Sequence, residues 1–173
     1  PQEGLLRHFT AIADAASVPC VLYNIPGRSA VNMTVETTLR LAAHPRIVGV
    51  KEASGDLAQI GRVIAGAPGG FHVWSGNDSD TLAVMAMGGY GVVSVAGHLL
   101  GRQIRAMIDA CLAGDLLGAA GLHHRMTPLV DALFIESNPI PLKFALNEIG
   151  FGVGAPRLPL VPASEGAAAR IRA

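Results

Sequence analysis

Apolar residues in the first hundred positions follow two patterns that alternate along the chain. Short runs of apolar and β-branched residues, typical of buried strands, occupy residues 18–23, 47–51, 71–76 and 91–95. Apolar positions at helical spacing fill the stretches around them, at residues 5–16, 34–43, 56–65 and 79–87. Continuous apolar strands that alternate with helices predict an α/β fold, with a parallel sheet covered by helices.

Beyond Leu99 the pattern is helical only. We expect helices over residues 102–113, 116–134 and 139–149, then a proline-rich segment and a last short helix capped by Ser164. A (β/α)8 TIM barrel takes roughly 250 residues, so about four βα units are either half of such a barrel or an open doubly wound sheet. No strand is followed by the Gly-x-Gly-x-x-Gly turn of dinucleotide-binding folds. We therefore expect the C-terminal half of a (β/α)8 TIM barrel over residues 1–100, followed by a C-terminal helical domain over residues 101–173.

Charge and cysteine content narrow the expected partners. The 13 basic and 13 acidic residues balance, without a block of like charge. The sequence therefore predicts no nucleic-acid partner and no membrane surface, and favours small molecules or copies of the same chain. Cys20 and Cys111 lie in apolar surroundings and are interpreted as reduced core residues of a cytoplasmic protein. We expect no signal peptide, because no basic segment followed by an apolar stretch opens the sequence.

The uncharged stretch from Thr81 to Gly101 has about the length of a membrane span. Its glycines, and above all the break at residues 88–91, favour a short buried helix, a turn and a strand instead. Asn77-Asp78-Ser79-Asp80 precedes this helix and is interpreted as its cap.

Lys51 is the sharpest candidate for chemistry. It ends the strand of residues 47–51, and parallel α/β folds place their sites at the carboxyl ends of strands. Apolar neighbours disfavour the charged form of a lysine, and a neutral amine can attack a carbonyl group. The alternative is a surface lysine paired with Glu52.

Four further positions share the same predicted rim. Tyr23 ends its own strand and could relay protons, or it is an aromatic core residue. Arg28 follows in the next loop, where it could hold a carboxylate or lie exposed without a role. Gly76 and Val93 end the other two strands, where the backbone can approach a small ligand closely. We expect no metal site, because the histidines at positions 123 and 124 lack a third ligand at suitable spacing.

Five segments of the chain together resemble the dihydrodipicolinate synthases of the pyruvate-dependent class I aldolase and N-acetylneuraminate lyase superfamily. In family order and spacing they are residues 23–28, 48–56, 75–78, 91–95 and 136–143. The resemblance implies a lyase of diaminopimelate and lysine biosynthesis that condenses pyruvate with L-aspartate 4-semialdehyde. It also implies a cytoplasmic homo-oligomer that uses no cofactor besides a covalent pyruvate imine.

The resemblance assigns a role to each candidate residue. Lys51 would form the Schiff base with pyruvate, and Tyr23 would carry protons. Arg28 would bind the carboxylate of L-aspartate 4-semialdehyde, and its presence favours the synthase over relatives that cleave sialic acid or keto-deoxy sugar acids. Backbone groups of Gly76 and Val93 would line the pyruvate pocket.

The first four βα units of the family have no counterpart in this sequence. Those units supply the paired threonines that hold the pyruvate carboxylate, and a second tyrosine that reaches across a subunit interface. Two other hypotheses therefore stay open. The chain is a non-catalytic half-barrel that self-associates through its open sheet, or it is a related keto-acid or sialic-acid aldolase.

Overall fold

The computed structural model describes residues 1–173, which divide into two compact units, residues 1–94 and 95–173. The division falls a few residues before the expected boundary near residue 100. The helix that opens the second unit begins at Gly97 and has a non-helical kink at Leu100.

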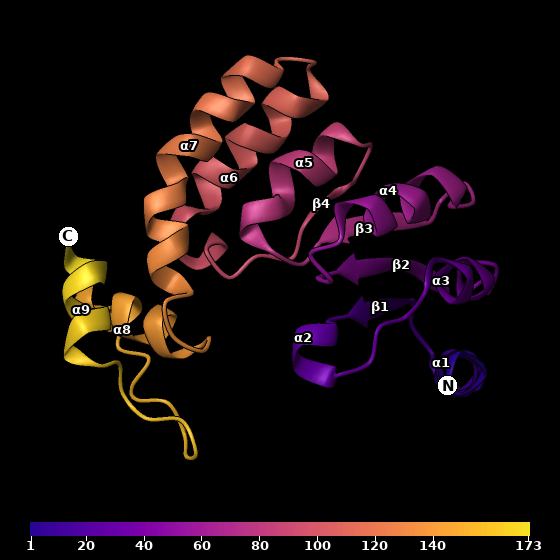
Figure 1. Cartoon of the computed structure of the whole chain (residues 1–173), viewed down its shortest axis with the longest axis horizontal. Helices are drawn as coiled ribbons and strands as arrows, with labels where there is room; N and C mark the ends of the chain where they lie inside the picture. Colours follow the sequence, from indigo (N-terminus) through magenta and orange to yellow (C-terminus); the bar gives the residue numbers. More distant parts are fainter. The chain divides into compact units, whose positions relative to one another are not determined.

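A parallel sheet of four strands organises the first unit (Figure 1). The strands are β1 (Cys20–Asn24), β2 (Ile47–Glu52), β3 (His72–Ser75) and β4 (Gly91–Val92). Their order in the sheet is their order in the sequence, and every neighbouring pair is parallel. The predicted strands are therefore present, although β4 is shorter than the predicted run of residues 91–95.

The helices of this unit are α1 (Gln2–Ala15), α3 (Val35–Ala42), α4 (Leu57–Gly66) and α5 (Thr81–Ala86), with the short α2 (Pro26–Ser29) between β1 and α3. Right-handed crossovers between successive parallel strands place their helices on one side of the sheet. A doubly wound sheet needs a reversal of strand order to place helices on both sides. Because the order β1-β2-β3-β4 never reverses, the sheet is a singly wound segment of the barrel type.

The two faces of the sheet differ in burial. Leu22, Val50 and Val73 point to the helical side and join the apolar core with side chains from α3, α4 and α5. Alternate residues point to the opposite face, where Val21 is 48% exposed and Tyr23 46% exposed. The helices of the first unit therefore cover one face of the sheet, and the other face carries the predicted site residues.

Local capping agrees with the sequence at some helix starts and differs at one. Thr34 caps α3 at the start of the predicted helix of residues 34–43, accepting a hydrogen bond of 3.3 Å from Thr37 N. The predicted cap at residues 77–80 is wrong, because these side chains do not cap η1 (Asp78–Asp80) or α5. The buried Asp78 carboxylate instead accepts a hydrogen bond from Ser94 Oγ, since a buried carboxylate needs a donor supplied by the fold.

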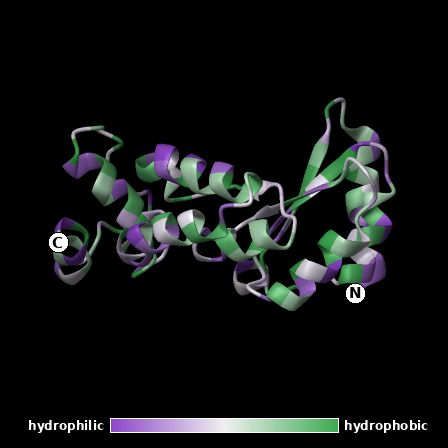
Figure 2. Ribbon diagram, turned by 90° about the horizontal axis from the view of Figure 1, so that it is seen from above, coloured by the Kyte–Doolittle hydropathy of each residue, from purple (hydrophilic) through white to green (hydrophobic).

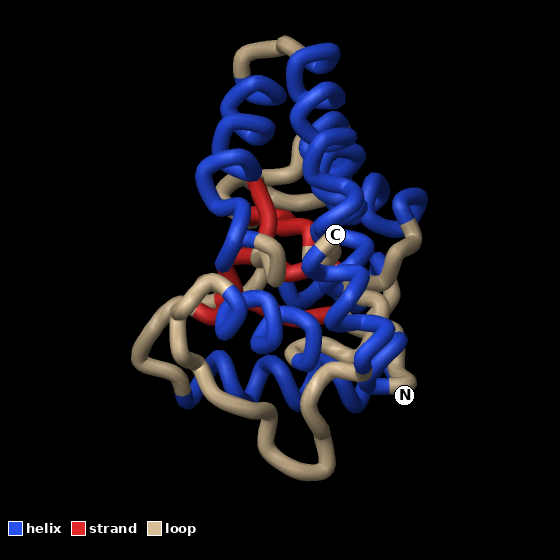
Figure 3. Tube along the Cα trace, turned by 90° about the vertical axis from the view of Figure 1, so that its left-hand side faces the viewer, coloured by secondary structure: helices blue, strands red, loops and turns tan.

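The second unit consists of helices joined by loops (Figure 3). They are α6 (Gly97–Leu112), α7 (Leu116–Leu133), α8 (Ile140–Glu148) and α9 (Glu165–Arg172). Gly114, at φ 80°, turns the chain between α6 and α7, and Asp115 caps α7 by accepting a 2.8 Å hydrogen bond from Gly118 N. Ser164 caps α9, as predicted.

Both cysteines are free thiols, as predicted. The prediction of core positions holds in part, because Cys20 packs against the apolar core of the first unit, although both side chains are only partly buried. Cys111 lies near the end of α6, and its partial burial raises the pKa of its thiol.

The helices carry hydrophobic and hydrophilic residues mixed along their length (Figure 2). No helix combines the length and the apolar character that a membrane crossing requires.

Candidate functional site

Lys51 and Tyr23 lie together on the open face of the sheet. They are register partners in the pairing of β1 with β2, so their side chains project from the same face. The Lys51 Nζ atom lies 4.2 Å from the centroid of the Tyr23 ring. Lys51 is partly buried and Tyr23 is about half exposed. An amine next to a phenol at strand ends can add to a carbonyl group and exchange protons during the addition.

Trp74 forms the surface next to Lys51 on this face, and sequence reasoning missed it. Trp74 is the register partner of Lys51 in β3. A methyl group added at Gly49 would lie 2.4 Å from Trp74 Cζ3, and one added at Gly91 would lie 3.6 Å from Trp74 Cδ1. The indole therefore extends across the sheet, over the glycine two residues before Lys51. Its position two residues before Gly76 was the available signal, because alternate residues of a strand share a face.

Two more rings continue this aromatic surface. The rings of His72 and Tyr90 have centroids 4.0 Å apart, and the Tyr90 ring lies 5.3 Å from that of Trp74. Tyr90 is 56% exposed. The open face thus presents a lysine among aromatic side chains, an arrangement that can exclude water from a small ligand.

Gly76 and Val93 use their backbone amides within the sheet. Gly76 N donates to Glu52 O at 2.7 Å, and Val93 N donates to Ser75 O at 2.9 Å. The carbonyl oxygens of both residues are therefore the backbone groups that could meet a ligand. A methyl group added at Gly76 would lie 2.5 Å from the Ala53 side chain, so the close approach of β2 and β3 explains this glycine.

Arg28 follows β1 in the sequence, but no contact joins its side chain to the candidate site. It lies exposed in α2, whose last turn ends at Ala30 with a left-handed backbone. Its side chain makes no hydrogen bond or ion pair with Lys51 or Tyr23. The role of Arg28 therefore stays a prediction.

A buried polar cluster lies behind the strand ends and was also missed by sequence reasoning. Glu52 is 1% exposed and Asn24 is 2% exposed, and the Asn24 amide donates to both carboxylate oxygens at 3.1 Å. Each follows a candidate residue directly, Asn24 after Tyr23 and Glu52 after Lys51. The sequence interpretation that paired Lys51 with Glu52 at the surface is wrong, because the two side chains leave opposite faces of β2.

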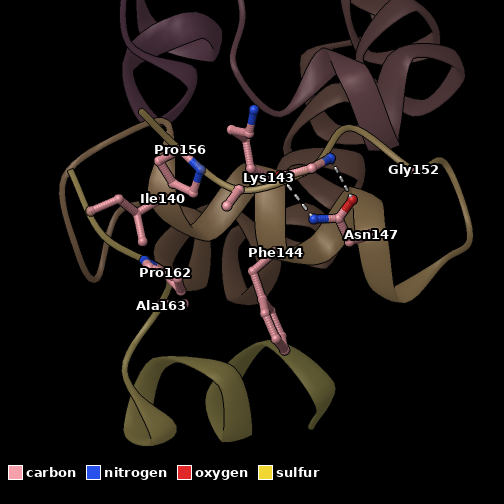
Figure 4. Close-up of a pocket in the computed structure, with 10 residues that line it drawn as sticks. Ile140, Lys143, Phe144, Asn147, Gly152, Pro156, Pro162 and Ala163 are labelled. Atoms are coloured by element: carbon pink, nitrogen blue, oxygen red, sulfur yellow. Dashed lines mark hydrogen bonds between the residues drawn. The ribbon is translucent and has the colours of Figure 1, made fainter. Parts of the chain in front are cut away.

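The second unit has a separate surface pocket of about 380 Å³ between α8 and the segment that follows it (Figure 4). Lys143 Nζ donates to Val153 O at 3.0 Å, and Asn147 bonds both the amide and the carbonyl of Gly154. These contacts hold the segment of residues 150–156 against α8. The polar side chains of Lys143 and Asn147 in this pocket are therefore engaged in holding that segment in place.

The fold and the site together define a class. A singly wound parallel sheet, with a lysine at a strand end on the face away from the helices, is part of a TIM-type barrel with its candidate site on the barrel interior. The profile of the Dihydrodipicolinate synthetase family matches residues 1–173. The chain belongs to this family.

Curated relatives match nearly the whole chain. A 4-hydroxy-tetrahydrodipicolinate synthase of Dehalococcoides mccartyi is 53% identical over 171 residues, which are 99% of this chain and 58% of the relative. One from Symbiobacterium thermophilum is 52% identical over 166 residues, 95% of this chain and 56% of the relative. The chain thus spans less than two thirds of the length of these relatives.

Solved structures confirm the fold. A crystal structure of the Cyanidioschyzon merolae enzyme with lysine bound is 45% identical, with a TM-score of 0.97 over 99% of this chain and 59% of that one. Dihydrodipicolinate synthase from Thermotoga maritima is 41% identical, with a TM-score of 0.97 over 99% of this chain and 60% of that one. The prediction of a partial TIM barrel is therefore confirmed.

Proposed function

We propose that the chain supplies the lysine side of an active site that condenses pyruvate with L-aspartate 4-semialdehyde. The observation that carries the proposal is the Lys51 amine, 4.2 Å from the centroid of the Tyr23 ring on the open face of the sheet. Membership of the Dihydrodipicolinate synthetase family supports this reading. So do the relatives named 4-hydroxy-tetrahydrodipicolinate synthase.

The proposed chemistry needs an amine and a proton carrier. The neutral Lys51 amine adds to the C2 carbonyl of pyruvate, and the resulting carbinolamine loses water to give an imine. The Tyr23 phenol donates a proton to the departing hydroxyl group and recovers one from the nitrogen. Transfer of a proton from C3 to the imine nitrogen gives an enamine. C3 then forms a carbon–carbon bond to the aldehyde carbon of the second substrate, and the aldehyde oxygen takes up the proton that the nitrogen releases as it returns to the imine.

Three further residues have proposed binding roles. The Arg28 guanidinium would hold the carboxylate of L-aspartate 4-semialdehyde through two parallel hydrogen bonds. The carbonyl oxygens of Gly76 and Val93 would line the space for pyruvate, because their amides are already used within the sheet. Four strands cannot close a barrel of eight, so we expect the complete site to need further βα units.

Reductive trapping tests the proposal on the chain as it stands. The protein is incubated with pyruvate and borohydride, digested, and analysed by mass spectrometry. The expected result is the mass of one reduced pyruvyl group at Lys51. Lys143 is the only other lysine of the sequence and serves as an internal control, because its amine donates to a backbone carbonyl in the second unit. Absence of the adduct from a folded sample, or equal labelling of both lysines, would remove the catalytic role of Lys51.

The open sheet face favours a second candidate function, assembly. Val21, Tyr23 and Tyr90 are each about half exposed on that face, and β1 and β4 are edge strands. Self-association of the 173-residue chain would cover both features, and two copies of four strands match the number in a barrel. Sedimentation velocity decides this: a monodisperse monomer contradicts it. An assay of condensation against cleavage of sialic acid or keto-deoxy sugar acids separates the synthase from the related aldolases.

A further inference from the structure

Glu52 is a fully buried carboxylate without a cationic partner. It is 1% exposed and takes part in none of the ion pairs of the chain. Its oxygens accept hydrogen bonds from the Asn24 amide at 3.1 Å, from Ser54 N at 2.9 Å and from the Gln59 amide at 3.4 Å. All of these donors are N–H groups, the set that an acceptor-only carboxylate requires. Buried carboxylates are rare in proteins, so this cluster calls for a functional explanation.

Asn24 connects this carboxylate to the segment that carries Arg28. The Asn24 amide also donates to Asn32 Oδ1 at 2.8 Å, and Asn24 Oδ1 accepts from Met33 N at 3.0 Å. The chain leaves β1 at Asn24 and returns to the same side chain at Asn32 and Met33. The Asn24 side chain therefore joins the two ends of the intervening segment, which contains Arg28.

The cluster and the candidate site occupy opposite faces of the same strand ends. Successive residues of a strand project to opposite faces. The pair Asn24–Glu52 thus lies directly behind the pair Tyr23–Lys51, and both pairs are register partners of β1 and β2. Ala53 N donates to Asn24 O at 2.8 Å, and the Asn24–Glu52 side-chain bond adds to this backbone bond at the strand ends from which the amine and the phenol project.

We infer that Glu52 is a positioning residue for the Lys51 amine, acting through Asn24 and the ends of β1 and β2. This inference rests on the proposed function, because it assigns Glu52 a part in imine formation at Lys51. Glu52 does not touch the reacting atoms. Displacement of a reacting group by about 1 Å costs on the order of 100-fold in rate, so a shift of about half that size at the strand ends corresponds to roughly tenfold.

An exchange of charge and amide between the two positions provides the test. Glu52→Gln places an amide donor among the existing donors, and Asn24→Asp places a second carboxylate beside the first. The double variant Glu52→Gln/Asn24→Asp restores one acceptor facing one donor, with the positions exchanged. Glu36→Gln, in an exposed carboxylate of α3, is the matched control.

The measurement is the rate constant of borohydride-trapped pyruvate labelling at Lys51, at saturating pyruvate. We expect each single variant to label at least about tenfold more slowly, and the double variant and the control to label at close to the parent rate. A merely structural role predicts a different result. When folding is faster than labelling, a destabilised protein labels at the parent rate constant multiplied by its folded fraction, and the folded fraction is obtained independently from the unfolding curve.

Each outcome supports or overturns the inference. Parent rate constants in the folded single variants overturn it, and so does a folded double variant that labels as slowly as the single ones. If a single variant does not fold, the double variant decides, because recovery of both folding and rate supports the exchange and failure to fold contradicts it. Absence of any adduct in the parent protein is a separate result, which removes the proposed function and the role of Glu52 with it.

Discussion

Replacement of Gly49 by alanine tests how closely β3 packs on β2 beside Lys51. A methyl group at this position would lie 2.3 Å from the His72 carbonyl oxygen and 2.4 Å from Trp74 Cζ3. Both distances are about 1 Å or more inside ordinary van der Waals contact. The ring can turn aside, but the carbonyl belongs to the strand paired with Gly49 and can move only with its backbone.

The expected cost follows from that geometry. Overpacking in a well-packed region costs about 1–3 kcal/mol, and a clash with backbone belongs at the upper end, so we expect Gly49→Ala to lower the free energy of unfolding by about 2–3 kcal/mol. Gly91 is the matched control, because it lies on the other side of Trp74 and an added methyl group there would be 3.6 Å from Trp74 Cδ1, an ordinary contact. Gly91→Ala should remain within about 1 kcal/mol of the parent.

Urea unfolding followed by tryptophan fluorescence measures both variants. Trp74 is the only tryptophan of the chain, so the signal reports on the first unit. Free energies of unfolding are obtained by linear extrapolation. Equal destabilisation by the two alanines would refute the claim that the Trp74 indole and the His72 carbonyl leave no space for a side chain at position 49.

Three further predictions concern other parts of the molecule. Asp56 caps α4 by accepting a 2.9 Å hydrogen bond from Gln59 N, so Asp56→Ala should cost about 1 kcal/mol in the same urea assay, and an unchanged midpoint would contradict the cap. The side-chain hydrogen bond from Arg172 lowers the pKa of Glu148; the attachment of α9 that it supports is therefore present above the ordinary glutamate pKa and lost as pH falls through the lowered value. Amide exchange of α9, corrected for intrinsic rates, should become faster as the pH is lowered from about 7 to about 3, and Glu148→Gln should remove that pH dependence. Equal protection of α9 in the parent protein at both pH values would disprove this role of the ion pair. Burial raises the pKa of the Cys111 thiol, so iodoacetamide near neutral pH should label Cys111 more slowly in the folded chain than in urea, and equal rates would count against the assignment.

The sequence by itself determined the kinds of elements and their order. Strands and helices can be predicted from the sequence because the repeat of apolar positions is set locally, over about one turn of a helix or two residues of a strand. It also placed Lys51 and Tyr23 correctly at strand ends, since the carboxyl ends of parallel strands share one rim. The family resemblance followed from motifs in register, and the matched profile over residues 1–173 confirms it.

Only the tertiary structure decided what stands on each side of the sheet. The Asn24–Glu52 bond joins residues 28 positions apart, and the bond between Ser94 and Asp78 joins residues 16 positions apart. No periodic pattern reports such a pair, because its partners meet only after the crossovers have set the strand register. For the same reason Asp78 was mistaken for a cap, although its carboxylate is buried and paired with Ser94. Trp74 became part of the site only when pairing placed it opposite Lys51. Local chemistry fixes what each residue can do, and the register of distant strands fixes which residues do it together.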